Sequence, residues 1–183
     1  LFGASVTNIS LLINTIFASF LAVGSVSWLY YSERLAYFPL GVFGVALATV
    51  VLPHLSRKHA ENSITQYQAA LDWGIRCNLL IAVPATLSLV FFAKAFVTTM
   101  LGYGNFAQYD VLKVSESVMA YGVGLPAFML IKLFSTAFYA KQDVKTPVKV
   151  AIIAVFANIF LNALLIYPFK HVGLALATSF SSW

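Results

Sequence analysis

The stretch 25-SVSWLYYSERLAYFPLGVFGVALATVVL-52 decides the fold of this chain, because it is almost entirely apolar and long enough to cross a membrane. A hydrocarbon core of ~30 Å needs about 20 helical residues. Glu33 and Arg34 interrupt the stretch, and Arg34 lies roughly 13 Å along a helix that begins at Ser25. A charged group at that depth costs several kcal/mol, so it usually faces a partner, a polar cavity or a substrate path. The stretch favours a protein that moves a charged molecule through a membrane.

The composition extends this interpretation to the whole chain. Of its 183 residues, 61% are hydrophobic and 9% are charged, and the mean hydropathy is +0.87. A soluble domain with so little charge could not cover its own core. We therefore predict an all-α, polytopic transmembrane helical bundle. The expected spans are residues 6–23, 25–52, 72–92, 114–139, 148–168 and 172–183. Because the chain begins at Leu1 and the last span stops short at Trp183, we expect a piece of a larger protein.

Several classes of function are disfavoured. The net charge of +5 is spread between hydrophobic spans rather than gathered on one face, which argues against nucleic-acid binding. A single cysteine, Cys77, gives neither an internal disulfide nor a metal cluster. No hydrolase, metalloprotease or nucleotide-binding motif is present, so we expect a transporter and not an enzyme. Its energy would come from an ion gradient, the membrane potential or another polypeptide.

Two basic connectors predict the orientation in the membrane. The first, 53-PHLSRKHAENSITQYQ-68, and the second, 140-AKQDVKTPVK-149, are separated by two spans and therefore lie on the same side. The positive-inside rule makes that side cytoplasmic. The segment from Lys94 to Lys113, with its turn at 102–105, then lies outside as an interfacial helix and loop.

Prolines predict where the helices end or bend. Pro53 is expected to end the second span, whereas Pro39, Pro84 and Pro126 fall inside spans. Each internal proline frees a carbonyl and allows a kink. Bent helices suit a transporter whose halves rock, and static curvature is the alternative.

Arg34 is the main candidate for ligand binding. Adjacent helical residues point about 100° apart, so Glu33 does not face Arg34. A guanidinium is permanently charged and matches phosphate in a bidentate fork, which predicts a phosphate-bearing anion. The alternative is a carboxylate from another helix. Ser27 lies two turns before Arg34 on the same face, where it could share a polar lining.

A second group of polar residues lies within the spans. Asn158 and Asn162 are four residues apart and project from one helix face, while Asn14 and Thr178 lie in the first and last spans. Their oxygens could coordinate a small cation or bond helix to helix. Bonding between helices is favoured, because no carboxylate accompanies them.

Four strings in the chain, INTIFASFLAVGSVSWLYYSERL, PLGVFGVALATVVLPHLS, LDWGIR and FYAKQDVKTPVKVAI, resemble the MurJ (MviN) family of bacterial lipid II flippases. These belong to the multidrug/oligosaccharidyl-lipid/polysaccharide exporter superfamily. The resemblance implies helices 7 to 12 of a fourteen-helix inner-membrane protein, within the C-terminal lobe of a two-lobed exporter. It also implies that lipid II, an undecaprenyl-pyrophosphate-linked disaccharide pentapeptide, is flipped from the cytoplasmic to the periplasmic leaflet by alternating access.

The resemblance also implies roles for single residues. Arg34 matches a central-cavity arginine that engages the lipid-linked pyrophosphate, Glu33 matches an adjacent acidic position, and Ser27 matches a cavity-facing serine. Some family members are similar to sodium-coupled transporters, and the corresponding ligands here are Asn14, Asn158, Asn162, the backbone of Leu174, and Thr178.

Asparagines stand where that sodium site has carboxylates at its first and third positions. The exchange weakens the electrostatic hold on an ion and favours the membrane potential as the driving force. Two rival functions are an exporter of another polyprenyl-linked saccharide or a drug, and a non-transporting scaffold for envelope assembly.

Overall fold

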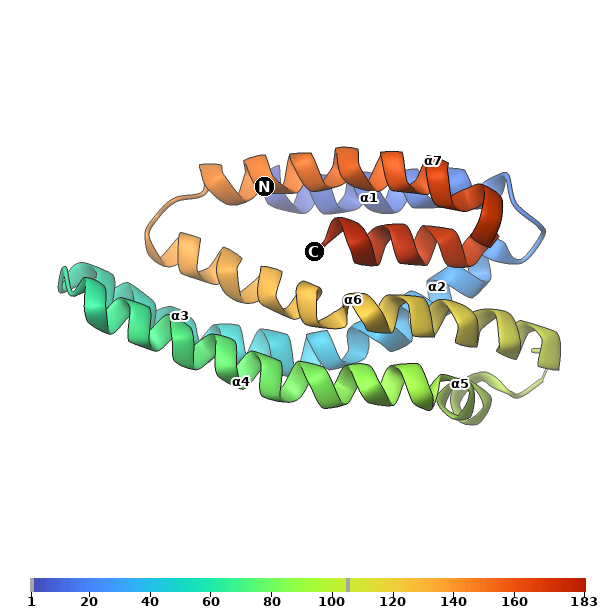
Figure 1. Ribbon diagram of the computed structural model, residues 1–183, viewed down its shortest axis with the longest axis horizontal. Helices are drawn as coiled ribbons and strands as arrows, with labels where there is room; N and C mark the ends of the chain where they lie inside the picture. The colour runs from blue at the N-terminus through green and yellow to red at the C-terminus, as the bar shows by residue number, and fades with distance from the viewer. Residues whose placement is uncertain (1, 105) are drawn as a thin grey trace.

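The computed structural model describes residues 2–104 and 106–183, with side chains from Leu11 onward. In order along the chain, these residues form α1 (Phe2–Ser19), α2 (Ser25–Pro39), the π-helical turn η1 (Leu40–Gly44), α3 (Val45–Ala60), α4 (Ile64–Phe91), α5 (Ala93–Leu101), α6 (Gln108–Ala140) and α7 (Lys145–Ser181). No strand occurs among them, and the long helices run along the long axis of the molecule (Figure 1). The predicted all-α fold is confirmed.

Among the described residues, four helical segments are long and apolar enough to cross a bilayer. They are Ser25–Ala60, Ile64–Phe91, Gln108–Ala140 and Lys145–Ser181. Each exceeds the roughly 20 residues that a hydrocarbon core requires. The short helix α5 differs, because it buries Ala93 and Val97 while Phe96 and Met100 stay exposed. Such an amphipathic helix suits the edge of a bilayer.

The α2–η1–α3 segment is one continuous helix that passes through two prolines. At Pro39 the helix widens, and the Val45 N–H donates to the Leu40 carbonyl five residues back. This wide turn accommodates the carbonyl that proline leaves without a donor.

The expectation that the helix ends at Pro53 was wrong, because α3 continues through it to Ala60. Proline removes a single backbone donor. Val51 and Leu55, on either side of it, are fully buried in one cluster with Tyr67 of α4 and Leu133 of α6. This burial holds the last turns of α3 in place.

Helix α6 is the centre of the bundle, since it packs against α2, α3, α4, α5 and α7. One close neighbour of α6 is the second part of α7. A side chain on Gly124 would place its Cβ only 2.6 Å from Ser179 Oγ and 2.8 Å from Ser179 Cα. Ser179 Oγ donates a 2.8 Å hydrogen bond to the Ala120 carbonyl. Small residues allow the two backbones to come this close, as is common between membrane helices.

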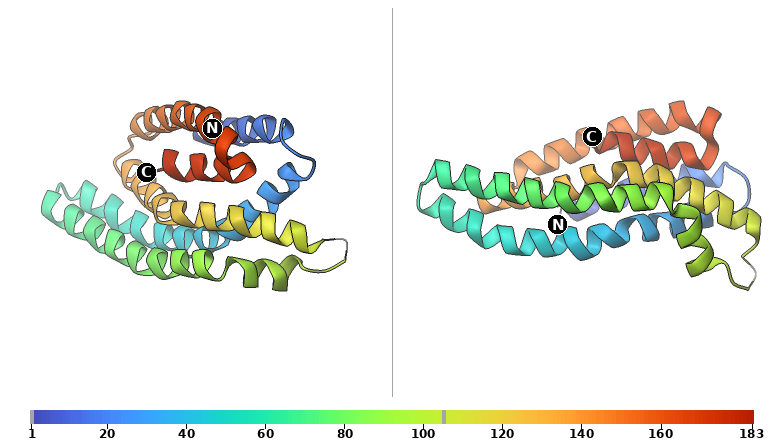
Figure 2. Two further views of the ribbon diagram at one scale, coloured as in Figure 1. Left: turned by 45° about the vertical axis from the view of Figure 1, so that its right-hand side comes forward. Right: turned by 60° about the horizontal axis from the view of Figure 1, so that its bottom comes forward.

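Helix α7 is broken at Lys170, whose φ of 51° and ψ of −127° are not helical. The break follows Pro168 and lies in the gap between the expected spans 148–168 and 172–183. The chain reverses there, so residues 171–181 lie between the first part of α7 and α6 (Figures 1 and 2).

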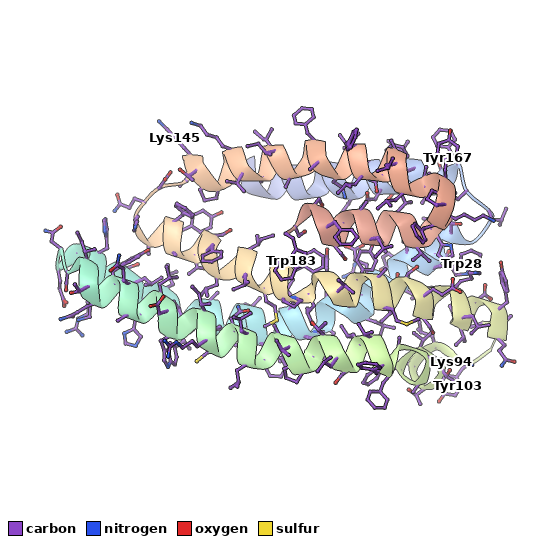
Figure 3. All side chains as sticks on the ribbon, in the orientation of Figure 1. Trp28, Lys94, Tyr103, Lys145, Tyr167 and Trp183 are labelled. Carbon is purple, nitrogen blue, oxygen red and sulfur yellow. The ribbon has the colours of Figure 1, made fainter. Side chains whose placement is uncertain are left out.

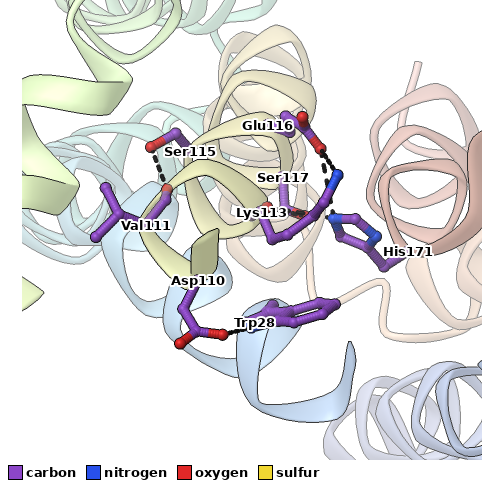
Figure 4. Close-up of polar contacts among 8 residues, drawn as sticks. All are labelled: Trp28, Asp110, Val111, Lys113, Ser115, Glu116, Ser117 and His171. Carbon is purple, nitrogen blue, oxygen red and sulfur yellow. Dashed lines mark hydrogen bonds and ion pairs between the residues drawn. The ribbon is translucent and has the colours of Figure 1, made fainter. Parts of the chain in front are cut away.

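Beside this reversal, polar side chains join α2, α6 and α7 (Figure 4). Trp28 Nε1 donates a 2.8 Å hydrogen bond to Asp110 Oδ1, and the Trp28 ring meets the His171 ring edge to face at 5.3 Å. His171 Nε2 lies 3.3 Å from the Lys113 carbonyl oxygen and 3.7 Å from Glu116 Oε2. Lys113 Nζ in turn lies 3.0 Å from Glu116 Oε2. These contacts fasten the three helices together at one end of the bundle.

Both basic connectors lie at the opposite end. The α3–α4 hairpin tip and the α6–α7 connection share that end, and the tip projects beyond the connection (Figures 1 and 2). Lys145 marks this end in Figure 3, while Lys94 and Tyr103 lie at the other. The expected turn at 102–105 is described only up to Gly104, since Asn105 lies outside the described residues.

This arrangement predicts opposite labelling of the two ends. The background is a full-length protein that carries this chain with Cys77→Ala and has no other accessible thiol. In this background, Tyr103→Cys should react with a membrane-impermeant thiol reagent in intact spheroplasts. Thr65→Cys should react only after permeabilisation. Both positions are exposed, so accessibility alone does not separate them. The reverse pattern would place the basic connectors outside and contradict the positive-inside argument.

The contact between α6 and α7 predicts that Gly124→Ala destabilises the protein. The added methyl group would collide with Ser179, and such overpacking typically costs about 1–3 kcal/mol. Gly41→Ala is the matched control, because nothing lies within 4 Å of the Cβ it would add. Thermal unfolding in detergent should show a lower midpoint for Gly124→Ala alone. Equal midpoints would mean that the two helices are not in this close contact.

Candidate functional site

An open cavity of about 460 Å³ lies between α1 and α2, with Tyr121 of α6 also in its wall. Helix α1 contributes four side chains from its second half, and α2 contributes the side chains along one face. The lining residues are Leu11, Asn14, Thr15, Ala18, Val26, Leu29, Tyr30, Glu33, Arg34, Tyr37, Phe38 and Tyr121. The cavity therefore contains Arg34 and Glu33, the two charged residues that sequence analysis singled out.

Arg34 lines this cavity beside Glu33 but is not joined to it in an ion pair. Its side chain is exposed, and its guanidinium carbon lies 5.1 Å from the centre of the Tyr30 ring. Among residues 11–104 and 106–183, Arg34 forms no ion pair. Stacking over an aromatic face stabilises a guanidinium while leaving its N–H groups free to bind an anion.

Three tyrosines in the cavity were missed by sequence analysis. Tyr30 stacks with Arg34, and Tyr37 meets Tyr121 edge to face with ring centres 6.2 Å apart. The spacing of Tyr30 and Arg34 by four residues could have revealed the first contact. Tyr121 could not be found in this way, because it comes from a helix distant in the sequence. Aromatic walls of this kind provide apolar contact area and hydroxyl groups together.

Ser27 does not join Arg34 in the cavity. It is exposed on α2 but is not among the residues that line the pocket. Val26 and Leu29 occupy the corresponding part of the wall instead. The cavity-facing role of Ser27 stays a prediction.

The five residues considered for a cation site do come together. Asn162 Nδ2 donates to Asn14 Oδ1 at 2.8 Å and to Asn158 Oδ1 at 3.0 Å. Asn14 Nδ2 and Asn158 Nδ2 both point to Thr178 Oγ1, at 3.1 and 3.4 Å. The Thr178 hydroxyl then donates to the Leu174 carbonyl at 3.0 Å. The network joins α1 to both parts of α7.

This arrangement is poorly suited to a sodium ion. Hard cations prefer oxygen ligands, and the amide nitrogen of Asn162 takes the place between the oxygens of Asn14 and Asn158. None of the five residues carries a charge. Asn162 Oδ1 is buried without a hydrogen-bond partner. Rotation of the Asn162 amide could turn this one oxygen toward an ion. Within the described residues, no cluster of histidine, cysteine or acidic side chains could hold a metal ion either.

Comparison with known proteins gives one family. Residues 1–183 match the family model described as lipid II flippase MurJ. A Vibrio cholerae protein named "Probable lipid II flippase MurJ" is 48% identical over 183 residues, which are all of this chain and 35% of that protein. The chain thus spans about a third of the length of the relatives it matches.

Solved structures agree with this result. A structure of lipid II flippase MurJ in an inward closed conformation superposes with a TM-score of 0.89 at 29% identity, covering 97% of this chain and 37% of the other. A multidrug resistance transporter of the MATE family, in the MOP superfamily, superposes with a TM-score of 0.85 over 99% of this chain and 40% of the other. At 17% identity, that second likeness shows the fold alone.

The family is one of multi-pass transporters of the bacterial inner membrane and not of enzymes, as the sequence led us to expect. The open cavity with its arginine, the long apolar helices and the match over the full chain lead to the same conclusion: this chain belongs to the lipid II flippase MurJ family.

Proposed function

We propose that the protein to which this chain belongs carries lipid II from the cytoplasmic to the periplasmic leaflet by alternating access. The observation that carries the proposal is Arg34, a permanent positive charge in an open cavity without a carboxylate partner among the described residues. The pyrophosphate of a lipid-linked precursor is the kind of group that such an arginine binds in a bidentate fork.

The depth of Arg34 explains why its charge matters for transport. A pyrophosphate that crosses the hydrocarbon core needs compensating charge along its path. Arg34 offers that charge about nine residues into α2, on the wall of the open cavity. Glu33, half-buried in the same cavity, limits the net positive charge and would help the anion to leave again.

Bends in the helices support an alternating mechanism. The wide turn at η1 begins directly after Pro39, nearly two turns beyond Arg34. A wide turn of this kind lets a helix bend with little loss of backbone hydrogen bonding. Transport requires that the ligand bind the inward and outward states differently, and a bend beside Arg34 would couple its position to that change.

We infer that the asparagine network ties α1 to α7 and does not couple transport to sodium. Its amides bond to one another except at Asn162 Oδ1, and none of the five residues is a carboxylate that could balance a cation. The membrane potential would then supply the energy, because moving one charge through 100 mV yields about 2.3 kcal/mol.

Removing the charge of Arg34 should impair transport. Arg34→Gln should lower lipid II flipping by about 10–100-fold, the range expected for losing a charge-assisted hydrogen bond. Arg34→Lys should retain part of the activity, because it keeps the charge and loses the planar fork. The measurement is lipid II translocation in cells depleted of their native flippase and complemented with the full-length variant.

Arg76→Gln is the matched control, since it removes one positive charge from an exposed arginine that does not line the cavity. Full activity of Arg34→Gln would refute the proposed role and favour a scaffold that transports nothing. Export of a cationic compound that improves when Arg34 is replaced would favour a drug exporter instead.

The sodium question has a separate test in Asn162→Ala. The variant loses two hydrogen bonds within a buried network, so we expect a loss of stability of about 1–3 kcal/mol. Flipping by the unmodified protein should be the same in sodium and in potassium buffers of equal ionic strength. Sodium-stimulated flipping that disappears in Asn162→Ala would show that the network does bind the ion.

A further inference from the structure

A second cavity, of about 410 Å³, lies at the other end of the bundle and shares no lining residue with the cavity around Arg34. It is formed where the α3–α4 connector meets the C-terminal end of α6. The lining residues are Lys58, His59, Asn62, Ser63, Ile64, Tyr67 and Lys141. No acidic residue is among them, so the wall is cationic and polar.

Tyr67 holds the cationic groups in place from the middle of this wall. Its ring is buried, and its hydroxyl donates a 2.8 Å hydrogen bond to the Ala137 carbonyl. Lys141 Nζ lies 4.6 Å from the centre of the ring, and the His59 ring meets it edge to face at 6.5 Å. A lysine held over an aromatic face is restrained, unlike one that extends freely into water.

Lys58 is also restrained. Its side chain is only 25% exposed, and its Nζ lies 2.9 Å from Glu61 Oε2. Glu61 is shared with Arg57, whose Nε lies 2.9 Å from the other carboxylate oxygen. Hydrogen bonds from Lys58 and Arg57 hold the pKa of Glu61 below its usual range, so it stays ionised. One carboxylate is thus shared by two cationic side chains, Arg57 and Lys58, and Lys141 adds a third positive charge over the Tyr67 ring.

The backbone adds to this positive field. Helix α4 begins at Ile64, and Ser63 makes no side-chain hydrogen bond that caps its first turn. The first N–H groups of a helix lack partners within it, and with the helix dipole they favour an anion. Here they border a cavity that already holds two lysines.

We propose that this cavity binds a phosphate group, with the headgroup of an anionic phospholipid as its main source. By the positive-inside rule, this end of the bundle meets the cytoplasmic leaflet, whose anionic lipids are attracted to basic residues next to the membrane. The Lys58 and Lys141 ammonium groups contact the phosphate oxygens, and the apolar side chain of Ile64 lies beside the lipid. The cavity shares no lining residue with the one around Arg34, so its test can be made without measuring lipid II transport.

The test uses the full-length protein, purified in mild detergent and incubated with phosphatidylglycerol or with zwitterionic phosphatidylcholine. Bound lipid is then counted by native mass spectrometry. The double variant Lys58→Gln/Lys141→Gln should retain about 25-fold less phosphatidylglycerol than the unmodified protein, since each lysine near a membrane surface contributes about a factor of five. Retention of phosphatidylcholine should not change.

The control is Lys145→Gln/Lys149→Gln, which removes the same charge from the start of α7, where neither lysine lines the cavity. A second arm replaces the lipid with inorganic phosphate and measures binding by calorimetry. Phosphate binding that needs Lys58 and Lys141, without added retention of lipid, would support the site and assign it to a soluble phosphate. Equal retention of lipid and phosphate by the cavity variant and the unmodified protein would overturn the proposal, as would an equal loss in the control.

Discussion

Between Ala120 and Gly124, α6 comes so close to the second part of α7 that Ser179 donates a hydrogen bond directly to an α6 backbone carbonyl. Membrane helices gain little from the hydrophobic effect when they associate, because lipid tails are as apolar as leucine side chains. Close packing and such hydrogen bonds must therefore hold them. With residues 171–181 fixed on α6, Leu174 and Thr178 are placed where α1 can reach them through Asn14. The wall of the Arg34 cavity on the α1 side depends on this chain of contacts.

The cationic side chains of the two cavities have different surroundings. Arg34 lies within α2, where it stacks on Tyr30. It forms no ion pair among the described residues. Lys58 and Lys141 lie at the end of the bundle and are restrained by Glu61 and by the Tyr67 ring. A charge within the bundle is costly to leave without a ligand, which suits a passing substrate. Charges at the surface cost less and suit a resident ligand that stays in its leaflet.

The asparagine network illustrates how one residue type changes the chemistry of a site. Carboxylates at the positions of Asn14 and Asn162 would repel each other at the 2.8 Å that separates their side-chain atoms, unless a cation lay between them. Amides at the same positions attract each other, because one donates and the other accepts. With acids at these positions the same backbone geometry would need a cation between them, whereas with amides it forms a tie between helices.

The sequence by itself determined the class of the protein, the main apolar helices, the two basic connectors and the prominence of Arg34. All of these follow from local composition and helical period, which a single segment carries within itself. The spacing of Asn158 and Asn162 was likewise readable as one helix face. The prediction at Pro53 was wrong, because it used only the local effect of proline on a helix. The burial of Val51 and Leu55 against α4 and α6 depends on the tertiary structure.

Only the tertiary structure decided which distant residues meet. Asn162 bonds to Asn14 across 148 positions of sequence, and Tyr67 to the carbonyl of Ala137 across 70. The tyrosine wall around Arg34, the exclusion of Ser27 from it and the second cavity all depend on how helices pack side by side. That packing is set by small residues such as Gly124 and by the reversal at Lys170. Helical periodicity shows which face of each helix is polar, but contacts between helices decide which polar faces share a cavity.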